Sequence, residues 1–313
     1  MTNRLGGVLH ATALLVTAAA VAACASDAAP AAKPAAAATR SVAAAHLHLD
    51  LVDRSRPAVD PIGVRSAATR SLPTELYVPA GSTRRPLIVF AHGFDGDPSK
   101  FTQLFQYWSD AGFAVVAPRF PITFTGAGGL SRAADFAQQP ADLSFVLDQV
   151  LHSKWAARVD PHRIGAAGLS LGGATIWGFI GNTCCRDPRV KAAIVMDGIQ
   201  ISFAAGKPLP NRMPLLVYHA DHDYSLPFAG ARTAYIAAAP PKYFVTIMGA
   251  FHAEPYENTP NPADEIVMRS STRFWRTYLL DQRAQRSGPS GRTQIMRAAT
   301  VPGVSTAENV PTR

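Results

Sequence analysis

The sequence predicts an α/β fold in which helices cover both faces of a mostly parallel sheet, without a large cap domain. Short runs of apolar and β-branched residues alternate with longer segments of helical period, which is typical of this class. A serine between glycines follows one of these runs, and an acidic cluster and a histidine follow two later ones. With 313 residues, 48% of them apolar, the chain can form one substantial domain plus extensions.

Two kinds of apolar segment predict the strands. Segments 46–52 and 73–78 alternate polar and apolar residues, as half-exposed strands do. Continuous apolar runs, typical of strands buried on both faces, occur at 87–91, 114–117, 164–167, 192–196, 215–218 and 244–247. Helices are predicted between them at 100–111, 139–152, 172–180, 228–238 and 263–280. Pro262 suits the first turn of the last helix.

The N-terminus predicts export. Arg4 precedes an apolar, Ala-rich run at 5–23 without an acidic residue, which is the pattern of a signal peptide and too short to favour a permanent membrane helix. The run ends in Val-Ala-Ala-Cys24, which resembles the lipobox of bacterial lipoproteins. The resemblance implies a signal peptide at 1–23, lipid attachment at Cys24 and a location at the bacterial cell membrane or envelope. The alternative is a plain secretory peptide cleaved nearby, with Cys24 incidental.

The segments flanking the domain have biased compositions. Residues 24–45 are rich in Ala and Pro and predict a flexible tether, and residues 46–282 are assigned to the domain. Residues 283–313 have few large apolar side chains and are expected to be disordered. From position 282 onward five arginines face one glutamate, so +4 of the net +8 lies in this tail. That excess favours attraction to anionic membrane, and the domain has no basic stripe with interleaved aromatics that would indicate nucleic-acid binding.

Two adjacent cysteines, Cys184 and Cys185, leave two alternatives open. An exported chain meets an oxidising environment, so they can form a vicinal disulfide. They can equally remain one buried and one exposed thiol after a helix. Neither has a histidine nearby, and two adjacent cysteines alone do not make a metal site.

The segment Gly168-Leu-Ser170-Leu-Gly172 carries the main chemical signal. It has the GxSxG pattern of a nucleophile elbow, directly after the strand at 164–167 and before the helix at 172–180. The turn from strand to helix is so sharp that the flanking positions must lack side chains, which leaves the serine hydroxyl projecting at the sheet edge. The sequence therefore predicts Ser170 as a nucleophile.

A serine hydroxyl needs a base to take its proton and a carboxylate to orient that base. In this arrangement the acid and then the histidine follow the serine along the chain, each after a strand. The strand at 215–218 leads into the acidic segment 220–223, and the strand at 244–247 leads to His252. His252 is therefore the predicted base.

With these residues, the chain resembles the α/β-hydrolase superfamily over residues 49–280, and within it the lidless esterases that include platelet-activating-factor acetylhydrolase, chlorophyllase and bacterial polyester hydrolases. Segment 51–57 (LVDRSRP) resembles the DxSRP segment of acetylhydrolase-like members, and 89–94 (VFAHGF) resembles the family's HG loop. The resemblance implies an oxyanion hole formed by the backbone N–H groups of Phe94 and Leu171.

The acid is chosen on the same resemblance. Segment 220–227 (ADHDYSLP) is similar to the family pattern in which the orienting aspartate stands four residues before a proline, which selects Asp223. Asp221 is the near rival, with a loop hydrogen bond or strand cap as its expected role. Asp197 is a third candidate, because some family members place the acid after the preceding strand.

The remaining histidines are expected to be structural. His92 is expected to orient the oxyanion loop, and His219 and His222 to support the acid loop. A metal cluster of His219, Asp221 and Asp223 is disfavoured because alternate residues of an extended segment point in different directions. We therefore predict neither a metal nor a cofactor. The phenylalanines expected to line an acyl pocket, or else to be ordinary core, are Phe94, Phe124 and Phe251.

These features together predict a serine hydrolase that cleaves carboxylic esters through an acyl-enzyme on Ser170. Residues 198–212 are too few for a helical cap, and 120–138 is expected to border the site as a mobile flap. Such an open cleft suits small, lipid or polymeric esters. The alternatives are an amide or peptide hydrolase on the same fold and a non-catalytic binding lipoprotein. The oligomeric state and the physiological substrate are not encoded in these patterns.

Overall fold

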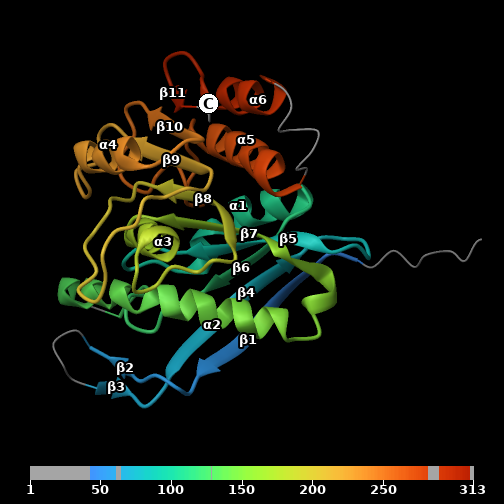
Figure 1. Cartoon of the computed structure of the whole chain (residues 1–313), viewed down its shortest axis with the longest axis vertical. Helices are drawn as coiled ribbons and strands as arrows, with labels where there is room; N and C mark the ends of the chain where they lie inside the picture. Colours follow the sequence, from blue (N-terminus) through green and yellow to red (C-terminus); the bar gives the residue numbers. More distant parts are fainter. Residues whose placement is uncertain (1–42, 61–64, 128, 281–288, 311–313) are drawn as a thin grey trace, which may run out of the picture. The chain divides into compact units, whose positions relative to one another are not determined.

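A nine-stranded sheet forms the centre of the protein (Figure 1). The computed structural model describes residues 43–60, 65–127, 129–280 and 289–310. In spatial order the strands are β1 (Ala45–Asp53), β4 (Arg70–Val78), β6 (Ala114–Pro118), β5 (Arg85–Ala91), β7 (Val159–Leu169), β8 (Val190–Met196), β9 (Leu215–Ala220), β10 (Lys242–Ile247) and β11 (Ser305–Val310). The strands from β6 to β10 run parallel, whereas β1, β4 and β11 join through antiparallel pairs. The predicted α/β class is confirmed.

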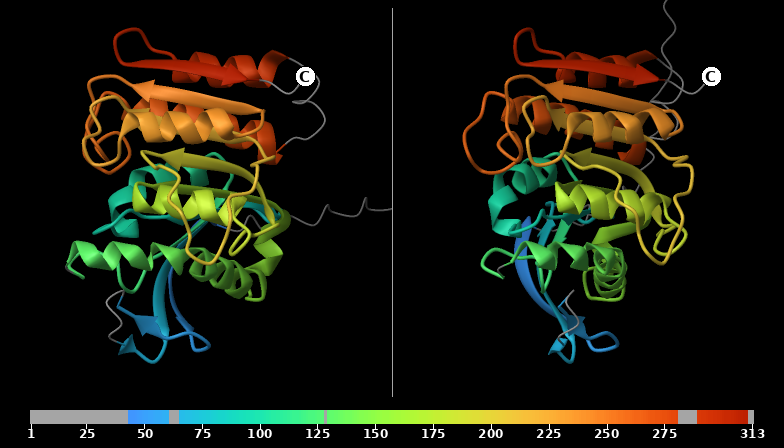
Figure 2. Two further views of the ribbon diagram at one scale, coloured as in Figure 1. Left: turned by 60° about the vertical axis from the view of Figure 1, so that its left-hand side comes forward. Right: turned by 90° about the vertical axis from the view of Figure 1, so that its left-hand side faces the viewer.

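Helices cover both faces of this sheet (Figure 2). The face with α2 (Gln139–Leu151), α3 (Leu171–Gly181) and α4 (Phe228–Ala237) forms one apolar core. The face with α1 (Thr102–Asp110), α5 (Asp264–Trp275) and α6 (Pro289–Ala299) forms the other. Successive strand residues point to opposite faces, so in β5 Val89 packs into the first core and Phe90 into the second. Burial on both faces explains the continuous apolar runs of the central strands.

The order of the strands determines where a site can form. From β5 the chain crosses first to β6 on one side and then to β7 on the other, so the connections leave the ends of β5 and β7 in opposite directions. At such a switch point a crevice opens at the carboxyl ends of parallel strands. The segments that follow β5 and β7 carry Phe94 and Ser170.

The DxSRP-like segment is a structural link. Asp53 accepts hydrogen bonds from the backbone and hydroxyl of Ser55 and pairs with Arg56 at 2.8 Å, while Arg56 also donates to Asp142 of α2 at 2.6 Å. The buried guanidinium of Arg70 joins Asp142 to Asp135. Because Asp135 belongs to a 3₁₀ helix (Leu130–Ala137), the segment predicted as a flap at 120–138 is anchored in its second half.

The C-terminal segment differs from its prediction. Residues 283–313 were expected to be disordered, but 289–310 form α6 and β11, and the remainder lies outside the described residues. Ile295 and Ala299 are fully buried on the α5 side of the sheet, and β11 pairs with β10 along its whole length. An edge strand is held by backbone hydrogen bonds, so low apolar content did not indicate disorder here.

Cys184 and Cys185 form a disulfide just after α3. Of the two alternatives left open by the sequence, a vicinal disulfide or two free thiols, the structure has the disulfide. The predicted signal peptide at 1–23, Cys24 and the tether as far as residue 42 lie outside the described residues. Within the part of the chain that the structure describes, no helix has both the length and the hydropathy needed to cross a membrane.

Candidate active site

Ser170 stands in the sharp turn between β7 and α3. Its backbone has φ 58° and ψ −120°, a conformation that L residues rarely adopt, and its amide donates to the carbonyl of Met196 at 2.8 Å. A Cβ at Gly172 would lie 2.1 Å from the carbonyl oxygen of Ala91, and one at Gly168 would lie 2.5 Å from that of Gly172. The prediction that the flanking positions must lack side chains is therefore confirmed.

His252 lies in the loop after β10 and contacts both of its predicted partners. Its Nε2 is 2.7 Å from the hydroxyl of Ser170, and its Nδ1 is 2.6 Å from Oδ2 of Asp223. With Asp223 ionised, Nδ1–H donates to the carboxylate and Nε2 is left to accept the serine proton. Three residues that are far apart in the sequence thus form one hydrogen-bonded chain.

Asp223 is held as an anion. Its Oδ1 accepts the backbone N–H groups of Ser225 and Leu226 at 2.8 and 2.9 Å, and its Oδ2 faces His252. Burial raises the pKa of Asp223, but the hydrogen bonds from His252 and the two amides outweigh it, so the pKa is lowered. The loop that leads to Pro227 therefore supplies the donors that stabilise the charge.

The electrostatic surroundings favour the protonated form of His252. Burial lowers the pKa of His252, but the hydrogen bond to Asp223 and the charges of Asp197 and Asp223 reverse the effect, so its pKa is raised above 6.5. A higher pKa means that the imidazolium formed on taking a proton from Ser170 is stabilised.

A second carboxylate approaches the same histidine. Asp197, at the end of β8, is fully buried, and its Oδ2 is 3.9 Å from Nδ1 of His252. Its Oδ1 accepts from the amide of Ala220 at 2.8 Å and the hydroxyl of Tyr256 at 3.0 Å. Burial raises the pKa of Asp197 to about 6, against the opposing charge of His219. Asp197 therefore lies beside the Ser170–His252–Asp223 chain without a hydrogen bond to the imidazole.

Asp221 joins two loops. Its carboxylate accepts the amide of Gly249 at 2.7 Å, and the amide of His222 donates to Ala250 at 3.2 Å. These bonds hold the loop that carries Asp223 against the loop that carries His252. Asp221 thus has the loop hydrogen bond expected for it, and the ion pairs of His252 within the described structure are with Asp197 and Asp223 instead.

The HG loop lies against Ser170. A Cβ at Gly93 would be 3.0 Å from the Cβ and 3.5 Å from the Oγ of Ser170. Within the described residues, the N–H groups of Phe94 and Leu171 donate to no protein acceptor. The amides that follow Gly93 and Ser170 are thus available to an anionic oxygen, and α3 begins at Leu171, directly after the serine.

His92 fixes this loop. The side chain is fully buried, its Nδ1 is 2.7 Å from the carbonyl of Gly93, and its Nε2 accepts the amide of Phe120 at 3.0 Å. Burial lowers the pKa of His92 to about 4, so the ring is neutral with the proton on Nδ1. The structural role expected for His92 agrees with these contacts.

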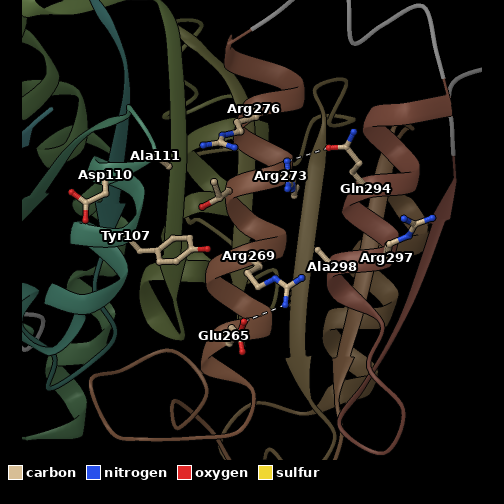
Figure 3. Close-up of a pocket in the computed structure, with 11 residues that line it drawn as sticks. Tyr107, Asp110, Ala111, Glu265, Arg269, Arg273, Arg276, Gln294, Arg297 and Ala298 are labelled. Carbon is tan, nitrogen blue, oxygen red and sulfur yellow. Dashed lines mark hydrogen bonds and ion pairs between the residues drawn. The ribbon is translucent and has the colours of Figure 1, made fainter. Parts of the chain in front are cut away.

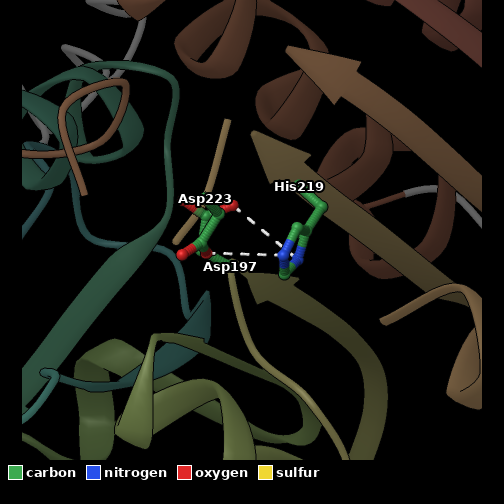
Figure 4. A group of neighbouring side chains, drawn as sticks. All are labelled: Asp197, His219 and Asp223. Atoms are coloured by element: carbon green, nitrogen blue, oxygen red, sulfur yellow. Dashed lines mark ion pairs between the residues drawn. The ribbon is translucent and has the colours of Figure 1, made fainter. Parts of the chain in front are cut away.

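Among the described residues, Asp197, His219 and Asp223 lie close enough together to share a metal ion (Figure 4). The cluster considered from the sequence had Asp221 in place of Asp197. His219 is buried and donates from Nε2 to the carbonyl of Leu226 at 2.9 Å, which supports the acid loop as expected. Both oxygens of Asp223 already accept hydrogen bonds. A cation here would compete with His252 for Asp223, so the cluster belongs to the site already described.

Aromatic rings form the exposed rim beside Asp223 and His252. Tyr224 is 83% and Phe251 47% exposed, and with His222 they form a cluster with ring centroids 6.0 to 6.4 Å apart. Phe94 and Phe124 are half-buried. None of the three phenylalanines considered for an acyl pocket is therefore ordinary core.

Sequence reasoning did not find Tyr256 or the exposed side chain of Tyr224. Tyr256 is buried four residues after His252 and donates to Asp197. Its segment has no helical or strand period, so nothing local indicated the contact. Tyr224 directly follows Asp223, and that adjacency was the available signal.

Comparison with known proteins places the chain in a family. The sequence model described as "Alpha/beta hydrolase family" matches residues 88–307, more than half of the chain. A Fusarium protein named "Hydrolase LUC6" is 31% identical over 133 residues, covering 41% of this chain and 30% of that protein. An Escherichia coli "Uncharacterized 31.7 kDa protein in traX-finO intergenic region" is 31% identical over 133 residues, covering 41% of each chain. The chain thus spans less than half the length of these relatives. By the family match, this protein belongs to the alpha/beta hydrolase family.

Proposed function

We propose that the protein is a serine hydrolase that cleaves carboxylic esters. The observation that carries the proposal is the chain of two short contacts, Ser170 Oγ to His252 Nε2 at 2.7 Å and His252 Nδ1 to Asp223 Oδ2 at 2.6 Å. Nucleophile, base and orienting acid are within hydrogen-bond reach of one another, as acyl transfer requires. Membership of the alpha/beta hydrolase family supports the same chemistry.

Acylation begins when Ser170 Oγ attacks the carbonyl carbon of the ester. The serine proton passes to Nε2 of His252, and the carbonyl oxygen becomes an anion that the amides of Phe94 and Leu171 bind. The tetrahedral intermediate collapses as the carbon–oxygen bond to the alcohol breaks. His252 returns its proton to the leaving oxygen, which gives the free alcohol and an ester on Ser170.

Deacylation repeats these steps with water as the nucleophile. His252 takes a proton from water as the hydroxide forms its bond to the acyl carbon, and the same two amides bind the oxyanion. Collapse breaks the bond to Ser170 Oγ, which recovers the proton from His252. The carboxylic acid leaves, and no cofactor takes part in any step.

The choice of an ester rests on the resemblance of the HG loop, the elbow and the acid loop to lidless esterases. The exposed rings of Tyr224 and Phe251 support substrates with an apolar part, because rings beside the site can cover apolar surface that would otherwise contact water. Small, lipid and polymeric esters all meet this description. An amide or peptide bond is the rival within the same mechanism.

The test is turnover of a short-chain nitrophenyl ester and of the matching nitroanilide. Ser170→Ala should lower kcat for the ester by a factor of about 10⁵ to 10⁶, because His252 then has no serine hydroxyl to deprotonate. Ser82→Ala, a substitution at an exposed serine in the turn between β4 and β5, at the amino end of β5, is the matched control and should retain full activity. Equal activity of Ser170→Ala and wild type would reject the assignment, and faster anilide than ester turnover would favour the amide hydrolase.

A binding lipoprotein that only retains the fold is the remaining rival. A fluorophosphonate probe phosphonylates an activated serine and spares an ordinary one. The wild type should be labelled at Ser170 and Ser170→Ala should not, whereas an unlabelled wild type would favour the binding protein.

We also propose that the chain is exported and anchored to the bacterial cell membrane or envelope through a lipid on Cys24. Acyl chains contribute roughly 0.8 kcal/mol per buried methylene, so more than one chain would hold the domain at a membrane surface. The proposal rests on the sequence of the N-terminus. Metabolic labelling with a fatty-acid analogue should mark the wild type and not Cys24→Ala, and label in both would contradict it.

A further inference from the structure

A hollow of about 690 Å³ lies between α1, α5 and α6, on the face of the sheet opposite α3 (Figure 3). Its volume is within the range of small-molecule sites, about 300–1,000 Å³. One wall belongs to α6, through Gln294, Arg297 and Ala298. The C-terminal segment that completes the sheet edge therefore also completes this hollow.

Arginines dominate the lining. Arg269 and Arg273 belong to α5, and Arg276 begins the π-helical turn (Arg276–Leu280) that continues it. Arg297 lines the hollow from α6. We call this feature the arginine hollow, defined by these four residues. Two acidic residues, Asp110 and Glu265, also line it, so four positive charges minus two negative charges leave +2.

The four charges are incompletely paired. Arg269 forms an ion pair with Glu265 at 3.2 Å, and Arg273 donates to the neutral side chain of Gln294 at 3.2 Å (Figure 3). Among the described residues, no carboxylate lies within ion-pair distance of Arg276 or Arg297. Guanidinium groups stay charged at any physiological pH, so the hollow retains a net positive charge.

A buried hydroxyl without a partner lies in the same lining. Thr272 is only 5% exposed, and its Oγ1 has no hydrogen-bond partner in the described structure. A threonine inside a helix usually donates to the carbonyl four residues earlier, as Thr233 and Thr277 do here at 2.9 and 2.8 Å. That oxygen has almost no surface open to solvent, so Thr272 belongs to the buried wall of the hollow and the arginines supply the donors.

We propose that the arginine hollow binds a ligand that carries a phosphate monoester. A phosphate monoester has a charge of about −1.5 to −2 at pH 7, which matches the net charge of the lining. Its oxygens accept from planar guanidinium forks in pairs. The site is separate from Ser170 and His252, so this inference does not depend on the proposed ester hydrolysis.

A phosphate monoester can belong to a soluble metabolite or to the headgroup of a lipid. For the soluble source, glycerol 3-phosphate is titrated into the full chain at low salt, with heat as the readout and glycerol as the uncharged comparison. For the lipid source, cosedimentation is measured with phosphatidylcholine vesicles with and without phosphatidic acid. Saturable binding in the first experiment assigns a soluble ligand, and binding only to the phosphatidic acid vesicles assigns a headgroup.

The variants separate a built site from general positive charge. Arg273→Gln with Arg276→Gln should weaken binding by about a hundredfold, since hydrogen bonds to charged groups are the strongest contacts proposed here. The control is a double variant, Arg84→Gln with Arg212→Gln, at two exposed residues outside the hollow. It removes the same amount of charge and should bind the ligand as tightly as the wild type. Thr272→Val should bind as well as the wild type and melt at the same temperature or higher, because the unpaired hydroxyl is buried and does not reach the ligand.

Ester turnover should be the same in all of these variants, because none alters a residue near Ser170. The proposal is overturned if neither glycerol 3-phosphate nor phosphatidic acid vesicles bind the wild type. It is also overturned if the Arg273/Arg276 variant binds as well as the wild type, or if the Arg84/Arg212 control loses as much affinity as that variant.

Discussion

Asp223 and Asp197 stand at the ends of neighbouring parallel strands, and both carboxylates approach Nδ1 of His252, at 2.6 and 3.9 Å. Asp223 receives two backbone amides as well as the imidazole, and its pKa is lowered. Asp197 is fully buried and accepts from Ala220, Tyr256 and Ala253 at 2.8, 3.0 and 3.4 Å, and its pKa is raised to about 6. The pKa values of two aspartates in adjacent places are thus shifted in opposite directions.

The difference shows which feature selects the acid of such a site. Distance to the histidine separates the two carboxylates by little more than 1 Å. The backbone of the loop before Pro227 gives Asp223 its donors, whereas the burial of Asp197 costs more than its donors return. Each carboxylate accepts three hydrogen bonds, so the lengths of these bonds and the degree of burial, rather than the number of donors, determine which carboxylate is the more stable anion.

The largest expected effect comes from Asp223→Asn. An amide cannot stabilise the imidazolium and favours the wrong tautomer of His252, so kcat/KM should fall by about 10³ to 10⁴. Because folding lowers the pKa of Asp223, the variant should also be less stable at neutral pH, and the difference should vanish as the pH falls through that lowered pKa. Ester kinetics and urea unfolding at several pH values measure both. A loss of less than tenfold would mean that Asp197 serves as the acid.

Asp197→Asn should have the opposite effect on stability. Folding raises the pKa of Asp197 from 3.8 to about 6, so ionised Asp197 destabilises the fold as the pH rises through this window. The shift corresponds to a loss of about 3 kcal/mol in the free energy of unfolding of the wild type at pH 8. The neutral amide of the variant avoids this loss. At pH 3 the wild type is already protonated, so the two proteins do not differ in this respect. The free energy of unfolding of the variant should therefore exceed that of wild type only at the higher pH. A variant that is less stable at pH 8 would contradict the raised pKa.

The same substitution should slow turnover modestly and move its pH dependence. Turnover needs neutral His252, so the acid limb of the kcat/KM profile should lie above pH 6.5, because the pKa of His252 is raised. Loss of the Asp197 charge should shift this limb to lower pH and reduce kcat/KM by about tenfold, equivalent to roughly 1.4 kcal/mol of imidazolium stabilisation. An unshifted limb in the variant would show that Asp197 carries no charge when His252 titrates.

The smallest effect is expected for Asp221→Ala. This exposed carboxylate links the two loops through the amide of Gly249, and the loss of one such hydrogen bond costs about 0.5 to 1.5 kcal/mol. Activity should fall by less than about threefold, and the acid limb should not move. Asp221→Asn, which keeps an acceptor oxygen, is the matched control. A loss comparable to that of Asp223→Asn would overturn the comparison.

Local patterns in the sequence predicted most of the fold. The runs at 87–91 and 164–167 form β5 and β7 because strands buried on both faces need unbroken apolar residues. Segment 283–313 was misjudged, because β11 is held by the backbone of β10 and leaves no apolar pattern of its own. The arginine hollow depends on α6 and could not be predicted once this segment was taken as disordered.

The sequence by itself determined the nucleophile elbow at Ser170, since a glycine-flanked serine between a strand and a helix requires only local geometry. It also indicated which loops carry His252 and the acid, because parallel strands end at one sheet edge. Only the tertiary structure separated Asp197, Asp221 and Asp223, because their roles depend on donors from other loops and on burial that no single segment encodes. Charge state is a property of the assembled surroundings, whereas strand and turn preferences belong to the chain itself.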